Sequence, residues 1–181
     1  MKFTKFTPVV AVATALLFAG CASTRTQQTA GEQIDDGAIS AKVKAALIAD
    51  PAAEARHINV ETRRGVVQLN GFVETDKGRT QATRLAREVE GVRSVETNLT
   101  LKDQTRSLGE VVDDGTITGK VKAALIDSPV TKAYEIKVET NDGRVMLGGF
   151  VNSPAVRQEA GRLAGLVGGV VSVDNNLDVK K

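Results

Sequence analysis

Few residues in this chain of 181 could carry out covalent or metal chemistry. It contains one cysteine, Cys21, and one histidine, His57. A nucleophile–base pair or a metal centre needs several such groups to converge, and these two are too few for either. Two pairs of adjacent carboxylates, Asp35–Asp36 and Asp113–Asp114, are the remaining candidates. We therefore expect a protein that is not an enzyme and that has no cofactor or metal site.

Each carboxylate pair stands at the start of a predicted helix. After the first pair, Ile39, Val43 and Leu47 recur on one helical face, and a proline follows and ends the pattern. An aspartate at a helix start accepts hydrogen bonds from free N–H groups and interacts favourably with the helix dipole. We predict that both pairs are helix caps; catalysis or metal binding is the alternative.

Cys21 ends a segment that is typical of a secretory signal. Lys2 and Lys5 precede about twelve uncharged apolar and small residues, too few for a bilayer span of about 20. The ending "LLFAGC" resembles the bacterial lipoprotein signal, which implies that Cys21 is lipidated. The resemblance implies a signal peptide over 1–20 and attachment to the periplasmic face of the outer membrane. A plain secretory signal, which would leave a soluble periplasmic protein with a free thiol, is the alternative.

The rest of the chain consists of two copies of one sequence repeat. "KVKAALI" at Lys42–Ile48 recurs at Lys120–Ile126, and residues 35–102 align without gaps on 113–180, with roughly half the positions identical. We predict two domains with these bounds, a linker over 103–112 and a polar, flexible tether over 21–34. Because the linker is short, we expect the domains to dock. Glu135 occupies the place of His57 in the second copy, so we interpret His57 as a solvent-facing residue before a strand.

Each copy contains the same predicted elements. Alternating apolar residues surround a turn in both copies, and Asp142-Gly143 is a strong hairpin signal. A second helix with Ala82, Leu85 and Ala86 on one face follows, and then a third strand. We predict an α+β fold with two tandem α-β-β-α-β domains, each a three-stranded sheet covered by two helices.

The repeated words resemble a known family. "DDG", "KVKAAL", "VET", "GFV" and the closing "GV-SV--NL" together are similar to the BON domain, and the resemblance covers both copies. It implies a periplasmic or outer-membrane protein, and two such domains behind a lipidation signal resemble the dual-BON outer-membrane lipoproteins. Soluble, osmotically inducible periplasmic proteins of the family are similar to the same degree.

The first helix of the second copy is the candidate binding surface. At 100° per residue, small and apolar positions lie opposite the core face, with lysines on both sides. The candidate phospholipid contacts are Thr116, Lys120, Lys122, Ala123 and Ile126. The family resemblance implies lipid contact at this helix, although relatives can carry an aromatic residue where this chain has Thr116. A solvated face, with the isoleucine packed on the hairpin, is the alternative.

Charge and composition restrict the partners. The chain has 24 Lys and Arg against 22 Asp and Glu, and two of these lysines lie in the signal segment, so the remainder is neutral. Aromatic residues make up only 3%. We therefore expect no nucleic-acid partner. The expected function is support of the outer membrane under stress through anionic phospholipid. The alternative is an osmotic-stress-type periplasmic protein that acts through contacts with other envelope proteins or in a chaperone-like way.

Overall fold

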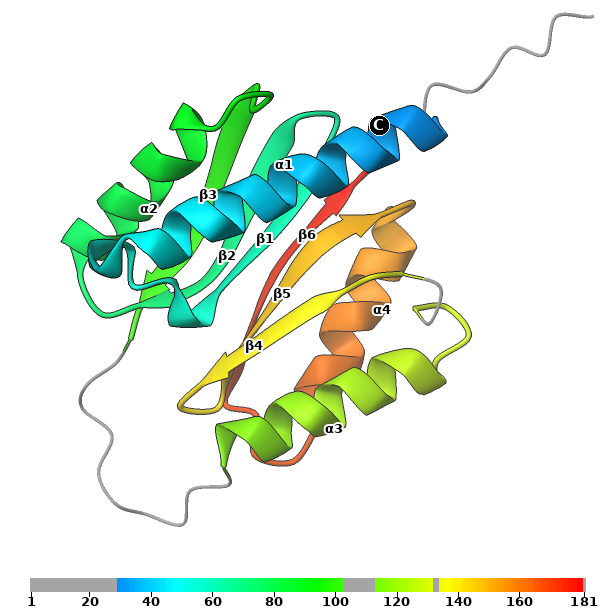
Figure 1. Cartoon of the computed structure of the whole chain (residues 1–181). Helices are drawn as coiled ribbons and strands as arrows, with labels where there is room; N and C mark the ends of the chain where they lie inside the picture. The colour runs from blue at the N-terminus through cyan, green and yellow to red at the C-terminus, as the bar shows by residue number, and fades with distance from the viewer. Residues whose placement is uncertain (1–28, 103–112, 132–133, 181) are drawn as a thin grey trace, which may run out of the picture.

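Each repeat forms one domain in the computed structural model, which describes residues 29–102, 113–131 and 134–180 (Figure 1). The first domain consists of α1 (Ala30–Ala49), the short 3₁₀ turns η1 (Pro51–Ala53) and η2 (Ala55–His57), β1 (Ile58–Arg63), β2 (Val66–Val73), α2 (Asp76–Glu88) and β3 (Ser94–Leu101). The second consists of α3 (Asp114–Asp127), β4 (Lys137–Asn141), β5 (Arg144–Val151), α4 (Pro154–Gly165) and β6 (Ser172–Val179).

The two sheets have the same topology. In the first domain the order is β1-β2-β3, with an antiparallel β1–β2 hairpin and a parallel β2–β3 pair joined by the crossover helix α2. The second domain repeats this as β4-β5-β6. The predicted α-β-β-α-β order and α+β class are confirmed.

Two helices cover one face of each sheet, as predicted. In the first domain Val43 and Leu47 of α1 pack on Val67 and Leu69 of β2 in a single buried cluster. The second domain has an equivalent cluster. Full burial of a Val or Leu side chain contributes about 1.5–3 kcal/mol, so these clusters supply most of the driving force for folding each domain. The identical letters of "KVKAALI" include these core positions.

Helix α1 begins earlier than the sequence pattern predicted. The hydroxyl of Thr29 accepts a hydrogen bond from the Glu32 N–H at 3.2 Å, and the Glu32 carboxylate accepts one from the Thr29 N–H at 2.8 Å. This reciprocal capping box starts the helix at Ala30. Residues 30–34 are therefore helical, although the tether was predicted over 21–34, and the pair Asp35–Asp36 lies inside the helix.

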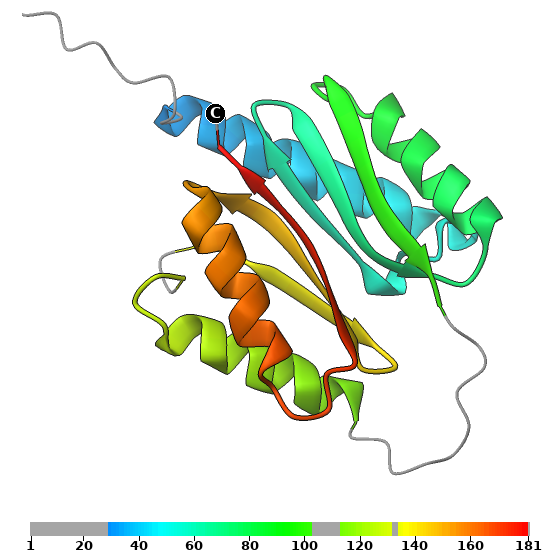
Figure 2. The ribbon, with the colours of Figure 1, turned by 180° about the vertical axis from the view of Figure 1, so that it is seen from behind.

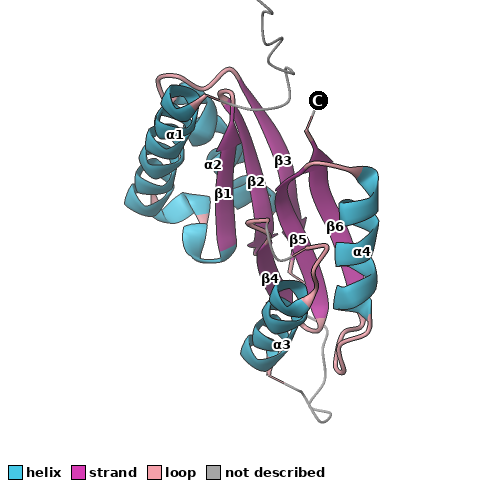
Figure 3. Ribbon diagram, turned by 90° about the vertical axis from the view of Figure 1, so that its right-hand side faces the viewer, coloured by secondary structure: helices cyan, strands magenta, loops and turns pink. Residues whose placement is uncertain are grey.

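The sheets meet through the faces that carry no helices (Figures 2 and 3). The central strands β2 and β5 lie against each other, so both of their faces are covered. Gln68, Asn70 and Phe72 of β2 and Met146 of β5 are at most 2% exposed, and none belongs to either helix-side core. The described part of the chain is thus arranged as helices, sheet, sheet and helices.

The backbone conformation explains why the repeated "GFV" begins with glycine in both domains. Gly71 and Gly149 have φ of +146° and +124°. A Cβ would lie 1.8 Å from the carbonyl oxygen of His57 at Gly71, and 2.8 Å from that of Glu135 at Gly149. Glycine is the residue that accepts both the positive φ and the close approach of a backbone carbonyl.

Candidate functional site

The paired aspartates hold hairpin turns. The Asp36 carboxylate accepts hydrogen bonds from the N–H groups of Arg64 at 2.6 Å and Gly65 at 2.9 Å. These two residues form the β1–β2 turn, with φ of +50° and +74°. Asp36 is 5% exposed. The second acid of the pair therefore fixes a tight turn against α1.

The second domain repeats this arrangement. The Asp114 carboxylate accepts from the N–H groups of Asp142 at 2.7 Å and Gly143 at 2.8 Å. Asp113 stands at the N-cap position of α3 but makes no side-chain capping bond. The capping prediction is therefore wrong. Asp36 and Asp114 hold hairpin turns instead, because their carboxylates accept from the turn N–H groups. The cap of α1 is Thr29.

His57 lies beside the junction of the two domains. Its side chain is 41% exposed, and its Nδ1 lies 4.0 Å from Oε2 of Glu139 in β4. Glu139 also accepts a hydrogen bond from the Asn59 amide at 2.9 Å. Within the described ranges, no group of three or more His, Cys, Asp or Glu side chains is placed to hold a metal ion.

The candidate lipid contacts share the outer face of α3. Ile117, Val121 and Leu125 face the core and are at most 4% exposed. Ile126, in the last turn, is 66% exposed, so it does not pack on the hairpin. The structure brings all five candidates together as exposed residues of one helix: Thr116, Lys120, Lys122, Ala123 and Ile126.

The equivalent lysines of α1 have acidic neighbours. Lys42 Nζ lies 3.9 Å from Glu90 Oε2, and the charge of Lys44 helps to lower the pKa of Glu135. Gly168 stands in the second copy where Glu90 stands in the first. Among the described residues, no carboxylate lies within ion-pair distance of Lys120 or Lys122. Helices α1 and α3 therefore present different electrostatic fields to a partner, although their sequences are similar.

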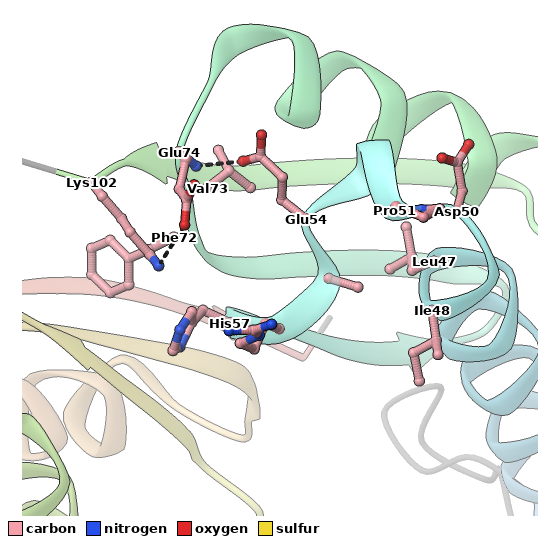
Figure 4. A pocket seen from close by; sticks show the side chains of 12 residues that line it. Leu47, Ile48, Asp50, Pro51, Glu54, His57, Phe72, Val73, Glu74 and Lys102 are labelled. Carbon is pink, nitrogen blue, oxygen red and sulfur yellow. Dashed lines mark hydrogen bonds and ion pairs between the residues drawn. The ribbon is translucent and has the colours of Figure 1, made fainter.

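A cleft opens beside Ile126. It has a volume of about 210 Å³. Lys122 and Ile126 of α3 line it, and so do Tyr134, Glu135 and Ile136 from the segment that leads to β4. The first domain has a larger cleft of about 670 Å³ at the corresponding place, below the end of α1 (Figure 4). There Glu54 accepts a hydrogen bond from the Glu74 N–H, and Lys102 lies 3.5 Å from the Glu74 carboxylate.

The interface between the sheets is polar at its centre. The Gln68 amide donates to Asp178 Oδ2 at 2.8 Å and to the Asn176 carbonyl at 3.0 Å, and its oxygen accepts from the Gly149 N–H at 2.8 Å. Asn70 fills the space above Gly148, where an added Cβ would lie 2.4 Å from the Asn70 Cγ. A polar side chain on one sheet thus fits a glycine on the other.

Two carboxyl groups meet at the same interface. A hydrogen bond with Asp178 and burial raise the pKa of Glu96 to about 6. At the rim, burial raises the pKa of Glu61 although Lys137 Nζ lies 3.4 Å from its carboxylate. Burial alone would lower the pKa of Lys137, but Glu135 and Glu61 outweigh it and raise the pKa.

The sequence led us to expect that the domains dock, and the two sheets do contact each other, but sequence reasoning did not identify the residues of this interface. The available signal was the pair Gln68 and Asn70 on the outward side of a strand whose second copy has Met146 and Gly148. Such a difference at outward positions indicates that the helix-free faces of the two sheets contact different residues.

The predicted signal segment and lipidation site are not tested by the structure. Cys21 and the signal segment lie outside the described residues. No helix in the described ranges is both long and apolar enough to cross a bilayer.

A duplicated α-β-β-α-β unit, docked sheet to sheet, places the chain among tandem α+β domain proteins. The family is the BON domain, which matches residues 35–103 and 113–181, and the chain belongs to it. The resemblance seen in the sequence is thereby confirmed.

Several characterised proteins are similar along most of their length. Osmotically-inducible protein Y of Escherichia coli strain K12 is 37% identical, covering 94% of this chain and 90% of that protein. Outer membrane lipoprotein DolP of Haemophilus influenzae is 32% identical, and the 21 kDa hemolysin of Actinobacillus pleuropneumoniae is 33% identical; each match covers 81% of this chain and 75% of the relative. The solved C-terminal domain of CdsD, from the type III secretion system of Chlamydia trachomatis, matches at a TM-score of 0.33 and 15% identity, covering 81% of this chain and 67% of that one.

Proposed function

We propose that this chain is a lipid-anchored, non-catalytic envelope protein that supports the outer membrane under stress, with α3 contacting anionic phospholipid. The names of two relatives support the coarser part of this proposal. One is osmotically inducible, and one is an outer membrane lipoprotein. Together they favour a stress-related function at the cell envelope. The proposed anchor is Cys21, which ends the lipoprotein-like signal segment.

The outer face of α3 supports the proposed lipid contact. Ile126 is 66% exposed, and Lys120 and Lys122 lie on either side of its arc. Lysine stems can lie along apolar surface while their ammonium groups reach lipid phosphates. The isoleucine side chain then enters the acyl boundary, as in an interfacial helix.

The expected affinity of this face is low. A lysine near an anionic surface contributes about 1 kcal/mol, and burial of an isoleucine side chain about 1.5–3 kcal/mol. Lys120, Lys122 and Ile126 together contribute about 3.5–5 kcal/mol, which corresponds to a dissociation constant near 1 mM. The anchor must therefore hold the protein at the membrane, while α3 orients the domain and selects charged lipid.

Vesicle co-sedimentation of soluble Ala22–Lys181 tests the contact. We expect weak binding to vesicles rich in phosphatidylglycerol, loss of that binding at high salt, and little binding to phosphatidylcholine. Lys120→Glu/Lys122→Glu should abolish it, whereas Lys42→Glu/Lys44→Glu in α1 is the matched control and should retain it. Equal loss in both variants, or binding that salt does not change, would contradict the assignment to α3.

The anchor needs its own experiment. Labelled palmitate should enter the wild-type protein and not Cys21→Ala, and the variant should move from the membrane fraction to the soluble periplasm. Cells carrying the variant should also become more sensitive to detergent and large antibiotics. An unlabelled wild type with unchanged mobility would contradict lipidation.

A second function is favoured by the match to Osmotically-inducible protein Y, which covers 94% of this chain. In this alternative the protein is soluble in the periplasm and acts through contacts with envelope proteins or unfolded clients. Capture of defined envelope proteins by the wild type, together with absent vesicle binding at low salt, would favour it over the lipid-binding function.

A further inference from the structure

A groove runs between α2 and the edge strand β3 of the first domain. It has a volume of about 700 Å³, and its walls carry Arg79, Arg84 and Arg87 from α2. Leu99 and Thr97 of β3 line the opposite side. Because β3 is the last strand of its sheet, the backbone groups along its outer side have no neighbouring strand in the described part of the chain.

The second domain fills the corresponding place. Asn175 stands where the first domain has Thr97, and its amide donates to the Arg157 carbonyl at 2.7 Å. The Arg157 guanidinium donates to the Asn175 carbonyl at 3.1 Å. Gly161 makes room, since a Cβ there would lie 2.7 Å from the Asn175 amide nitrogen.

The first domain has shorter side chains at these positions. Thr83 replaces Gly161, and its hydroxyl lies 3.1 Å from that of Thr97. Neither threonine reaches as far as the Asn175 amide does, so the groove stays open. Arg87, which the second domain replaces with Gly165, adds a cation to this groove.

The arginines are available to a ligand. Arg79 pairs with Asp76, and Arg84 lies 2.6 Å from Glu88, but these side chains are 44–67% exposed. Exposed ion pairs contribute little free energy, and a better-placed carboxylate can replace the local one. Three arginines stand against two carboxylates, Glu88 in the groove lining and Asp76 beside it, so the groove keeps a net positive charge that favours an anion.

We propose that this groove binds an acidic, extended polypeptide segment, whose backbone adds to the free edge of β3. The stretch Arg79–Glu88 spans about 14 Å of helix, which matches about four residues of a strand. Alternate side chains of the segment face the groove, so its carboxylates meet the arginines in bidentate pairs. An apolar side chain between them lies near Leu99. This is recognition by strand addition.

Fluorescence anisotropy with the intact two-domain protein tests this site. The probe is a labelled decapeptide of alternating Glu and Val, and a Lys–Val peptide is the charge control. Arg84→Ala/Arg87→Ala should weaken binding of the acidic peptide by about fivefold or more. Arg157→Ala/Arg162→Ala, the control in α4, should bind like the wild type.

A plugged groove gives the sharpest comparison. Thr83→Gly/Thr97→Asn installs the side chains of the second domain and keeps all three arginines, and we expect it to abolish peptide binding. If circular dichroism shows that this variant is unfolded, the exposed charge reversal Arg84→Glu/Arg87→Glu replaces it. In the wild type, bound peptide should slow hydrogen exchange in Ser94–Leu101.

Several results would overturn the proposal. These are wild-type affinity in a folded plugged or charge-reversed variant, equal loss in the α4 control, equal binding of the Lys–Val peptide, or unchanged exchange in β3. Binding of anionic vesicles that depends on Arg84 and Arg87, without peptide binding, would assign the groove to a membrane and reject it as a peptide site.

Discussion

Replacing Asp36 with alanine should destabilise the first domain far more than the same change at its neighbour. The Asp36 carboxylate holds two N–H groups of the β1–β2 turn, at 2.6 and 2.9 Å, and is 5% exposed. Asp35, next to it, is exposed. Asp35→Ala therefore serves as a control with the same loss of charge.

The magnitude follows from these two bonds. Hydrogen bonds to a charged group contribute about 1.5–3 kcal/mol each, so Asp36→Ala should cost at least about 3 kcal/mol. A domain of about 70 residues has a total stability of only about 3.5–10 kcal/mol. At about 4–8 °C per kcal/mol, its unfolding midpoint should fall by about 12 °C or more.

Two signals separate the domains in this experiment. Tyr134, the only tyrosine, reports on the second domain by fluorescence, and the Gly65 amide reports on the first by NMR. Asp36→Ala should shift the first transition and leave the second nearer its wild-type midpoint, and Asp114→Ala should do the reverse. If Asp36→Ala and Asp35→Ala unfold within about 0.5 kcal/mol of each other, the assigned role of the turn bonds is incorrect.

Three further predictions concern the glycines and the interface. Gly148→Ala should weaken domain docking, because its Cβ would lie 2.4 Å from Asn70, and faster hydrogen exchange in β2 and β5 would measure this. Asn70→Ala in the same chain should restore docking. Additive effects of the two substitutions would argue against the fit between Asn70 and Gly148. Gly71→Ala should cost more unfolding free energy than Gly149→Ala, because the carbonyl approach is 1.8 Å against 2.8 Å; the reverse order in denaturant titrations would contradict this reason. The raised pKa of Glu96, about 6, means that the folded protein binds a proton that the unfolded chain, near 4.5, has released. The resulting stabilisation is present below about pH 4.5 and is lost as pH rises through 6, so Glu96→Gln should remove part of the difference in melting temperature between pH 5 and 7.5; an unchanged difference would show that the carboxyl pair is not protonated in the fold.

The regular elements were predictable because their causes are local. The apolar spacing of Val43 and Leu47 and the turn Asp142-Gly143 identify a helix and a hairpin without knowledge of the rest of the chain. The duplication made this inference stronger, since the same pattern occurs twice. The outer face of α3 followed from the same periodicity. The periodicity left open whether Ile126 packs on the hairpin, and the structure places it 66% exposed.

The missed features depend on contacts distant in sequence. Asp36 lies next to a turn 28 residues further along the chain, and nothing in "DDG" distinguishes that bond from a cap. Gln68 interacts with a strand 110 residues away. The capping box of Thr29 and Glu32 was readable in principle, but the polar composition of the segment favoured a tether.

The contact between α3 and anionic phospholipid can be observed directly by NMR, using vesicles with and without spin-labelled lipid. We expect paramagnetic broadening of amides along α3, centred on Ala123 and Ile126, with phosphatidylglycerol present and salt low. Amides of Ala45 and Ile48 in α1 should broaden less, because Glu90 lies 3.9 Å from Lys42 of that helix. Equal broadening of the two helices, or broadening that persists in neutral vesicles, would contradict the claim that α3 is the phospholipid-binding surface.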